Sequence, residues 1–78
     1  MRARSYTVTV QWDADARVWF VSESDVLGLV TEAATLDQME QKLLVMIPEL
    51  LELNDNLPRQ QHVPFELIAR KHVSHLSA

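Results

Sequence analysis

Residues 5–22 have the sequence SYTVTVQWDADARVWFVS, and this stretch predicts a β-hairpin. In its first half, apolar and polar side chains alternate, which is typical of a strand with one buried face. The apolar members of that alternation are Tyr6, Val8, Val10 and Trp12. Residues 13–17 tolerate turn geometry, and a second run of β-branched and aromatic residues follows. We therefore predict strands at about 5–12 and 18–22.

The residues after the hairpin predict one more short strand and a helix. VTEA, at residues 30–33, follows a loop that contains Gly28, the only glycine of the chain. Thr35 to Gln38 fits a capping box, in which the threonine hydroxyl accepts a hydrogen bond from the Gln38 amide. Apolar residues then recur at helical spacing, so a helix is expected over about 36–53. These residues are Leu36, Met39, Leu43, Met46, Ile47, Leu50 and Leu53.

Two prolines interrupt these patterns. Pro48 removes an amide donor and collides with the carbonyl of Leu44, so we expect a kinked or broken helix there. Pro64 precedes a further apolar run, and we expect a last strand over about 65–73. The order is then β-β-β-α-β, and a right-handed crossover would place the last strand parallel to the first. We predict one domain over residues 1–78, an α+β two-layer sandwich.

The chain is acidic, and its charge is unevenly distributed. Its formal charge is −4, but residues 13–55 hold ten acidic residues against Arg17 and Lys42, which gives −8 for that block. An acidic body repels phosphate, so direct nucleic-acid binding is disfavoured and a basic protein partner is favoured. The chain has no cysteine and no apolar run long enough to cross a membrane. We therefore expect a soluble, cytoplasmic protein.

Four carboxylates flank the second strand, and they raise the question of a metal site. They are Asp13, Asp15, Glu23 and Asp25. That strand separates the first pair from the second by roughly 20 Å, so one metal ion cannot bridge them. His72 and His75 have helical spacing but no obvious third ligand. No nucleophile motif and no glycine-rich phosphate loop is present, so we predict no metal, no cofactor and no catalytic residue.

The run WDADARVWFVSESDVLGLVTEAATLDQMEQKLLVMIPELLEL resembles the HicB-like antitoxin domain. In that domain an Asp-rich hairpin turn leads to a strand, an Asp-Leu-Pro-Gly-type loop, a Thr-rich third strand and a Thr-capped helix. The residues of this chain that match are Asp13, Asp15, Asp25, Gly28, Thr31 and Thr35. The turn glycine of HicB domains is replaced by Ala16 or Arg17. The short relatives known as domain of unknown function family 1902 end their helix in a similar way to PELLELN.

This resemblance implies a partial RNase H-like fold and a protein that neutralises HicA, a small basic toxin that cleaves mRNA. Catalysis in RNase H-like enzymes gathers carboxylates from the middle of the first strand, the helix and the fourth strand around two metal ions. Here the middle of the first strand is Val8-Thr9-Val10, without a carboxylate. The resemblance therefore implies a binding protein and not a nuclease. Its expected toxin-binding residues are Asp13, Asp15, Glu23 and Asp25.

The alternative is a stand-alone homo-oligomeric interaction or structural module. One helix covers only one face of a sheet, yet the second strand is apolar on both faces, which favours a homodimer or higher oligomer. If the helix covers the face with Val18 and Phe20, the interface residues would be Trp19, Val21 and Ile68. If the helix covers the other face, Val18 and Phe20 would take their place. Trp12 and Trp19 are then expected to be core or interface residues and not base-stacking platforms.

Overall fold

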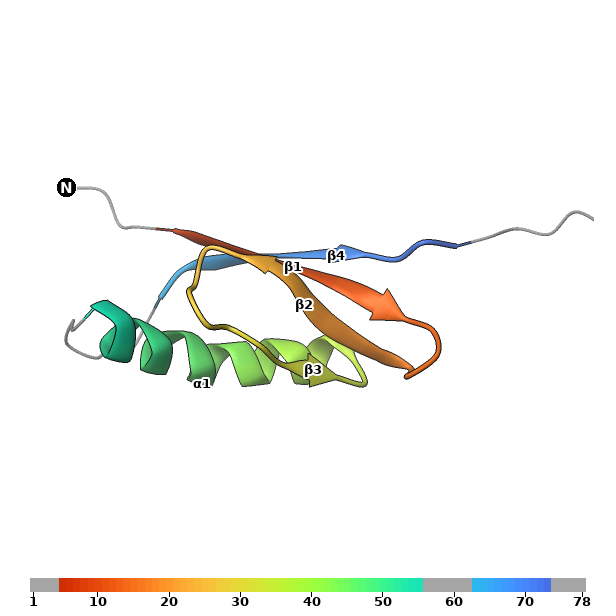
Figure 1. The fold of residues 1–78 in the computed structure, drawn as a ribbon, viewed down its shortest axis with the longest axis horizontal. Helices are drawn as coiled ribbons and strands as arrows, with labels where there is room; N and C mark the ends of the chain where they lie inside the picture. Colours follow the sequence, from red (N-terminus) through yellow and green to blue (C-terminus); the bar gives the residue numbers. More distant parts are fainter. Residues whose placement is uncertain (1–4, 56–62, 74–78) are drawn as a thin grey trace, which may run out of the picture.

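The computed structural model describes residues 5–55 and 63–73. Its elements are β1 (Tyr6–Asp13), β2 (Val18–Ser24), β3 (Glu32–Ala33), α1 (Leu36–Asp55) and β4 (Phe65–Arg70). The strands form one sheet in the order β3-β2-β1-β4, and α1 lies against one face of it (Figure 1). The predicted two-layer α+β sandwich with β-β-β-α-β order is confirmed. No helix in the described part of the chain is long and apolar enough to span a membrane.

The central strand β1 pairs with a neighbour on each side. It runs antiparallel to β2, as the hairpin pattern predicts. It runs parallel to β4, with Tyr6 opposite Phe65 and Gln11 opposite Arg70, as the crossover argument predicts. The register of the pairing between β1 and β2 shifts between Thr9 and Val10, so one residue of β2 has no partner on β1 and forms a β-bulge.

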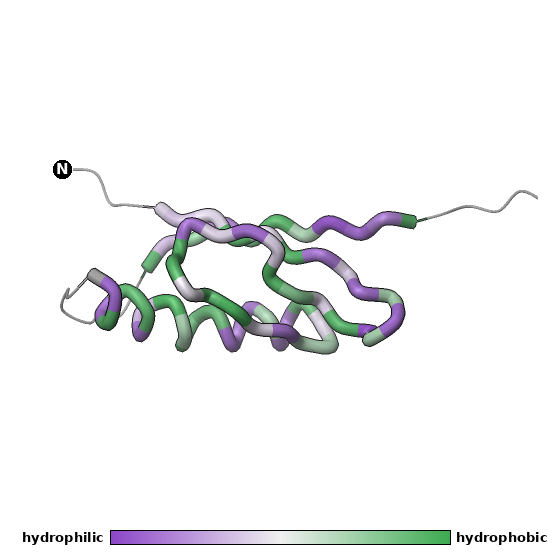
Figure 2. The backbone as a smooth tube through the Cα atoms, viewed as in Figure 1, coloured by the Kyte–Doolittle hydropathy of each residue, from purple (hydrophilic) through white to green (hydrophobic). Residues whose placement is uncertain are grey.

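The core lies between α1 and one face of the sheet. Tyr6, Val8 and Val10 are buried, so the alternation in β1 correctly identifies its inner face. They pack with buried residues from the helix and from the chain before it, namely Met39, Leu43, Ile47, Leu51, Val26, Leu29 and Ala33. Figure 2 shows hydrophobic residues recurring along α1 between hydrophilic ones. This apolar stripe is the physical reason that the helix lies on the sheet.

Helix α1 begins as predicted but does not break. The N–H of Gln38 donates to Thr35 Oγ1 at 3.0 Å, which caps the first turn. The helix then continues through Pro48 to Asp55 as one element of 20 residues, so of the two expected outcomes, a kink or a break, the break is wrong. Ile47 before the proline and Leu51 after it are both buried against the sheet. Packing on both sides therefore holds the helix together where one backbone hydrogen bond is lost.

The strand ends also differ from the prediction. Strand β2 runs to Ser24 and not to residue 22, because β1 continues to pair with it beyond the bulge. Strand β3 is limited to Glu32–Ala33, since Val30, in the predicted strand, is 82% exposed and has no partner on β2. Strand β4 ends at Arg70, the last residue with a partner on β1. His75 lies outside the described residues.

Candidate protein-binding surface

The four carboxylates between residues 13 and 25 lie at opposite ends of the hairpin. Asp13 is the last residue of β1 and Asp15 lies in the turn that follows. Glu23 lies opposite Thr9, and the backbone of Asp25 bonds to Thr7. The stretch of β1 from residue 7 to residue 13 is roughly 20 Å long. The structure therefore separates these residues into two pairs, as expected from the length of the strand.

The first pair belongs to a tight turn. Asp13 Oδ1 accepts hydrogen bonds from the N–H groups of Asp15 at 3.0 Å and Ala16 at 3.2 Å. The N–H of Arg17 donates to the Asp13 carbonyl at 2.7 Å. Arg17 has a φ of 58°, a left-handed conformation that favours glycine. Arg17 thus has a backbone conformation in which glycine is usually found, and the Asp13 carboxylate serves to build the turn.

The second pair lies beside a polar depression. Asp25 Oδ2 accepts a hydrogen bond from the N–H of Thr7 at 3.0 Å, and the N–H of Asp25 donates to the Thr7 carbonyl at 3.1 Å. Ser22 Oγ donates to the carbonyl of Thr9 at 3.2 Å. The depression has a volume of about 440 Å³ and is lined by Thr7, Thr9, Ser22, Glu23, Ser24 and Asp25. We call it the acidic depression.

The chemistry of the acidic depression suits a basic side chain. Glu23 and Asp25 are both exposed, so their carboxylates can accept charge-assisted hydrogen bonds from lysine or arginine. Asp25 holds the loop through Oδ2, so its other oxygen, Oδ1, can accept a bond from a partner. Within residues 5–55 and 63–73, no three histidine or acidic side chains gather as metal ligands would.

The sheet face that α1 leaves uncovered is not the one that carries Trp19 and Val21. Both of these side chains pack against the core beneath the helix, so the expectation that places them at an exposed interface is wrong. The alternative expectation applies, in which Val18 and Phe20 lie on the uncovered face. Strand pairing places Ile68 opposite Thr9 and Phe20 opposite Gln11, on the other face. The hydrophobic pattern of β2 alone did not distinguish its two faces, because both are apolar. We call the uncovered face, with Val18, Phe20 and Ile68, the open face.

A basic and aromatic cluster lies where β1 and β4 end. The rings of Trp12 and Trp19 are 5.3 Å apart between centroids, and Lys71 Nζ lies 5.2 Å from the centroid of Trp12. Arg70 and His72 line the same surface. This cluster is not evident from the sequence, because these residues meet only when β4 pairs in parallel with β1. The cation–π contact shields one face of Trp12 from a stacking ligand.

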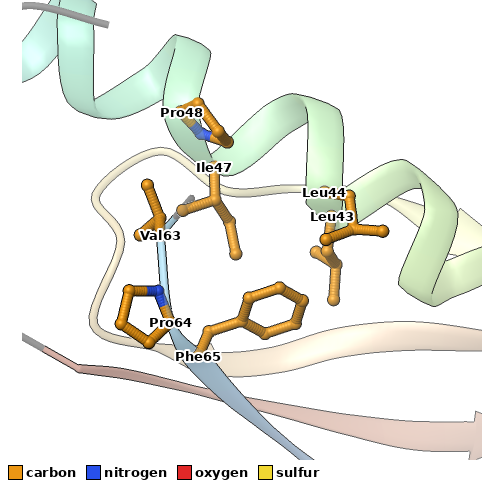
Figure 3. A pocket seen from close by; sticks show the side chains of 7 residues that line it. All are labelled: Leu43, Leu44, Ile47, Pro48, Val63, Pro64 and Phe65. Carbon is orange, nitrogen blue, oxygen red and sulfur yellow. The ribbon is translucent and has the colours of Figure 1, made fainter. Parts of the chain in front are cut away.

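The structure also has an apolar cleft that is not evident from the sequence. It lies between α1 and the chain that enters β4, has a volume of about 270 Å³, and is shown in Figure 3. Its lining residues are Leu43, Leu44, Ile47, Pro48, Val63, Pro64 and Phe65. In Figure 3 the Phe65 ring lies below the helix side chains, between Pro64 and Leu43. The sequence identified both prolines as interruptions but gave no sign that they share a cleft.

The fold and these surfaces define a small two-layer α+β domain with an acidic depression at one end of its hairpin. The chain matches the family described as Domain of unknown function (DUF1902) over residues 5–77, and it belongs to that family. This confirms the predicted resemblance to family 1902. No curated protein matches the chain.

A solved structure has the same fold. It is the crystal structure of hypothetical protein TTHA1013 from the extremely thermophilic bacterium Thermus thermophilus. The two chains are 43% identical, and the match has a TM-score of 0.68 and covers 95% of this chain and 100% of that one. The shared fold therefore extends over the whole length of the relative.

Proposed function

We propose that this protein is a non-catalytic HicB-like antitoxin that binds and neutralises a small, basic, RNA-cleaving toxin of the HicA type in the cytoplasm. The observation that carries the proposal is the acidic depression, where Glu23 and Asp25 lie together and exposed beside a row of hydroxyl groups. Carboxylates in this arrangement suit the lysine and arginine side chains with which a toxin would hold RNA. Occupying those side chains would mask the RNA-binding surface of the toxin.

The charge of the middle part of the chain supports the same partner. The net charge of −8 over residues 13–55 attracts a basic protein over a distance of about one Debye length and raises its association rate. The centre of β1 is Val8-Thr9-Val10, where an RNase H-like nuclease would need a carboxylate. A role in masking the toxin is therefore favoured over a role in cleavage.

The test uses a small basic protein encoded beside the gene for this chain. We expect this protein to cleave RNA by itself and to lose that activity when the chain is added in equal amount. The double variant Glu23→Gln and Asp25→Asn should weaken inhibition at least tenfold, because it removes two charges while retaining hydrogen-bond acceptors. The matched control is Glu40→Gln with Glu52→Gln, which removes two exposed charges from α1. Equal losses from both pairs would contradict a role for the acidic depression.

A second experiment separates masking from catalysis. The purified chain alone should not cleave RNA, and Mg²⁺ or Mn²⁺ should not raise its melting temperature. Metal-dependent RNA cleavage that disappears in Asp13→Asn or Asp25→Asn would overturn the proposal in favour of an enzyme.

The second candidate function is a stand-alone homo-oligomeric module without a toxin. It is favoured by the long outer edge of β4, with which no described residue pairs. A genome that encodes no small basic protein near this chain, together with a stable oligomer in solution, would favour this alternative.

A further inference from the structure

Strand β4 forms one edge of the sheet. The strand order is β3-β2-β1-β4, and none of residues 5–55 and 63–73 pairs with the outer side of β4 (Figure 1). Its six residues, Phe65–Arg70, present a row of backbone N–H and C=O groups on that side. Edge strands are usually blunted by an internal proline or lysine, by a bulge or by brevity. Strand β4 has no internal proline or lysine, since Pro64 precedes it, and the charged residues that it carries, Glu66 and Arg70, are opposite in sign.

We propose that two copies of this chain pair through β4, antiparallel, about a two-fold axis beside Ile68. The two four-stranded sheets would then form one continuous sheet, with both helices on the same side. The outer hydrogen-bonding groups of β4 would meet their counterparts on the second copy. This inference rests on the edge of β4 alone and is independent of the proposed toxin.

The geometry of the pairing limits the register. A two-fold axis perpendicular to the sheet leaves each side chain on its own face, so residues that lie opposite must point to the same side. The axis must therefore pass beside a residue of β4 and not between two residues. An axis at Leu67 would place Glu66 opposite Ile68, and an axis at Ala69 would place Ile68 opposite Arg70. Both registers pair a charge with an apolar side chain.

An axis at Ile68 makes the strand complementary to itself. Glu66 of one copy then lies opposite Arg70 of the other, and the same pair occurs a second time by symmetry. Ile68 meets its own counterpart between these two pairs. Glu66 and Arg70 are both exposed in the structure, so their side chains are available for the contact. Opposite charges directly across an antiparallel pair stabilise it, and like charges destabilise it.

The alternative contact, through the open face, is less favourable. That face carries the apolar side chains of Val18, Phe20 and Ile68, but the charged residues Glu23, Glu66 and Arg70 lie on it as well. Packing two such faces together would remove these carboxylates from water without a cation for each. Pairing at the edge leaves them in solvent. It also leaves the acidic depression, which lies between β1 and β2, open to a partner.

The first experiment reverses one charge at a time. We expect the natural chain to sediment as a dimer at 50 µM, a concentration chosen for the test. Glu66→Arg and Arg70→Glu should each weaken the dimer at least tenfold, because each places like charges opposite one another. A mixture of the two variants should dimerise again, since two arginines of one chain then face two glutamates of the other. The double variant, with both reversals, should also dimerise as the natural chain does.

The control for this experiment is Glu52→Arg, which reverses an exposed charge on α1, away from the edge. It should leave the dimer unchanged, and circular dichroism should show that all variants are folded. A natural chain that is monomeric, or a mixture that fails to restore the dimer lost in each variant, would overturn the proposal.

The second experiment traps the pair covalently. The chain has no cysteine, so Ile68→Cys introduces a single thiol. Residues directly opposite in an antiparallel pair have Cα atoms about 4.5–5.5 Å apart, within the range of a disulfide. Mild oxidation should therefore give a covalent dimer of Ile68→Cys but not of Phe20→Cys, which lies on the open face of β2. A covalent dimer of Phe20→Cys with equal yield would show contact through the open face and refute pairing at the edge.

Discussion

Trp12 and Trp19 lie opposite each other on β1 and β2, with their ring centroids 5.3 Å apart and their planes tilted by 59°. Both side chains are half-buried and lie on the same side of the sheet, and Trp19 packs against the core beneath α1. A tilted pair of this kind stabilises a protein by about 0.5–1.5 kcal/mol beyond the effect of buried area. The pair joins the two strands at the end of the hairpin that lies nearest the turn.

We expect Trp19→Ala to lower the free energy of unfolding by about 2 kcal/mol, less than the roughly 3–5 kcal/mol of a fully buried aromatic residue. A double-mutant cycle with Trp12→Ala should give a coupling of about 1 kcal/mol, because each single variant already loses the ring contact. Urea denaturation monitored by circular dichroism measures all four proteins. Additive effects would show that the rings do not interact.

Arg17→Gly should stabilise the protein. Arg17 has a φ of 58°, where a side chain costs about 1 kcal/mol and glycine costs little. The free energy of unfolding should therefore rise by about 1 kcal/mol in thermal or urea denaturation. Arg17→Ala is the matched control, since it removes the same charge and retains the unfavourable Cβ. A gain of the same size in both variants would indicate that the charge, and not the backbone, is responsible.

Asp25 links the end of β2 to the start of β1 by a hydrogen bond. Replacing it with alanine or with asparagine should therefore lower the free energy of unfolding by different amounts. Asp25→Ala removes the acceptor for the N–H of Thr7 and should lower the free energy of unfolding by about 1 kcal/mol. Asp25→Asn retains an oxygen acceptor and should cost less than half as much. Chemical denaturation of both variants measures the difference. If they are equally unstable, the charge of Asp25 and not its hydrogen bond holds the loop.

Pro48→Ala should also stabilise the protein, by about 1 kcal/mol. The alanine restores an N–H donor for the carbonyl of Leu44 and removes the clash of the proline ring with it. This gain in stability can reach about 3 kcal/mol. The buried ring of Pro48 lines the apolar cleft, so the substitution also loses the packing of that ring, which offsets part of the gain. Glu52→Ala, on the exposed side of α1, is the control and should change stability little. A loss of stability in Pro48→Ala would show that the packing of the ring dominates.

The fold follows closely from local patterns in the sequence. The alternation of Tyr6, Val8 and Val10 gave the inner face of β1, and the Thr35 cap gave the start of α1. Both are decided by neighbouring residues, which the sequence shows directly. The continuity of α1 through Pro48 depends instead on packing against the sheet, so it could not be inferred from the helix alone.

The surfaces were harder to predict than the elements. Strand β2 is apolar on both faces, so its pattern did not indicate that Trp19 and Val21 lie beneath the helix. The length of β2 correctly predicted that the four carboxylates lie in two separate pairs. It did not show that Asp13 builds a turn while Asp25 anchors a loop beside Thr7, because these roles depend on hydrogen bonds that form only in the folded hairpin.

The two edges of the sheet are unequal, and this limits how large an assembly can grow. Strand β3 has two residues, whereas β4 has six. A polymer that adds copies side by side needs two long edges on every copy, one for each neighbour. A sheet with one long edge and one short edge has a single attachment point, which is consumed when two copies meet. The brevity of β3 thus protects the protein against fibril formation and leaves a closed pair as the end point of edge-to-edge assembly.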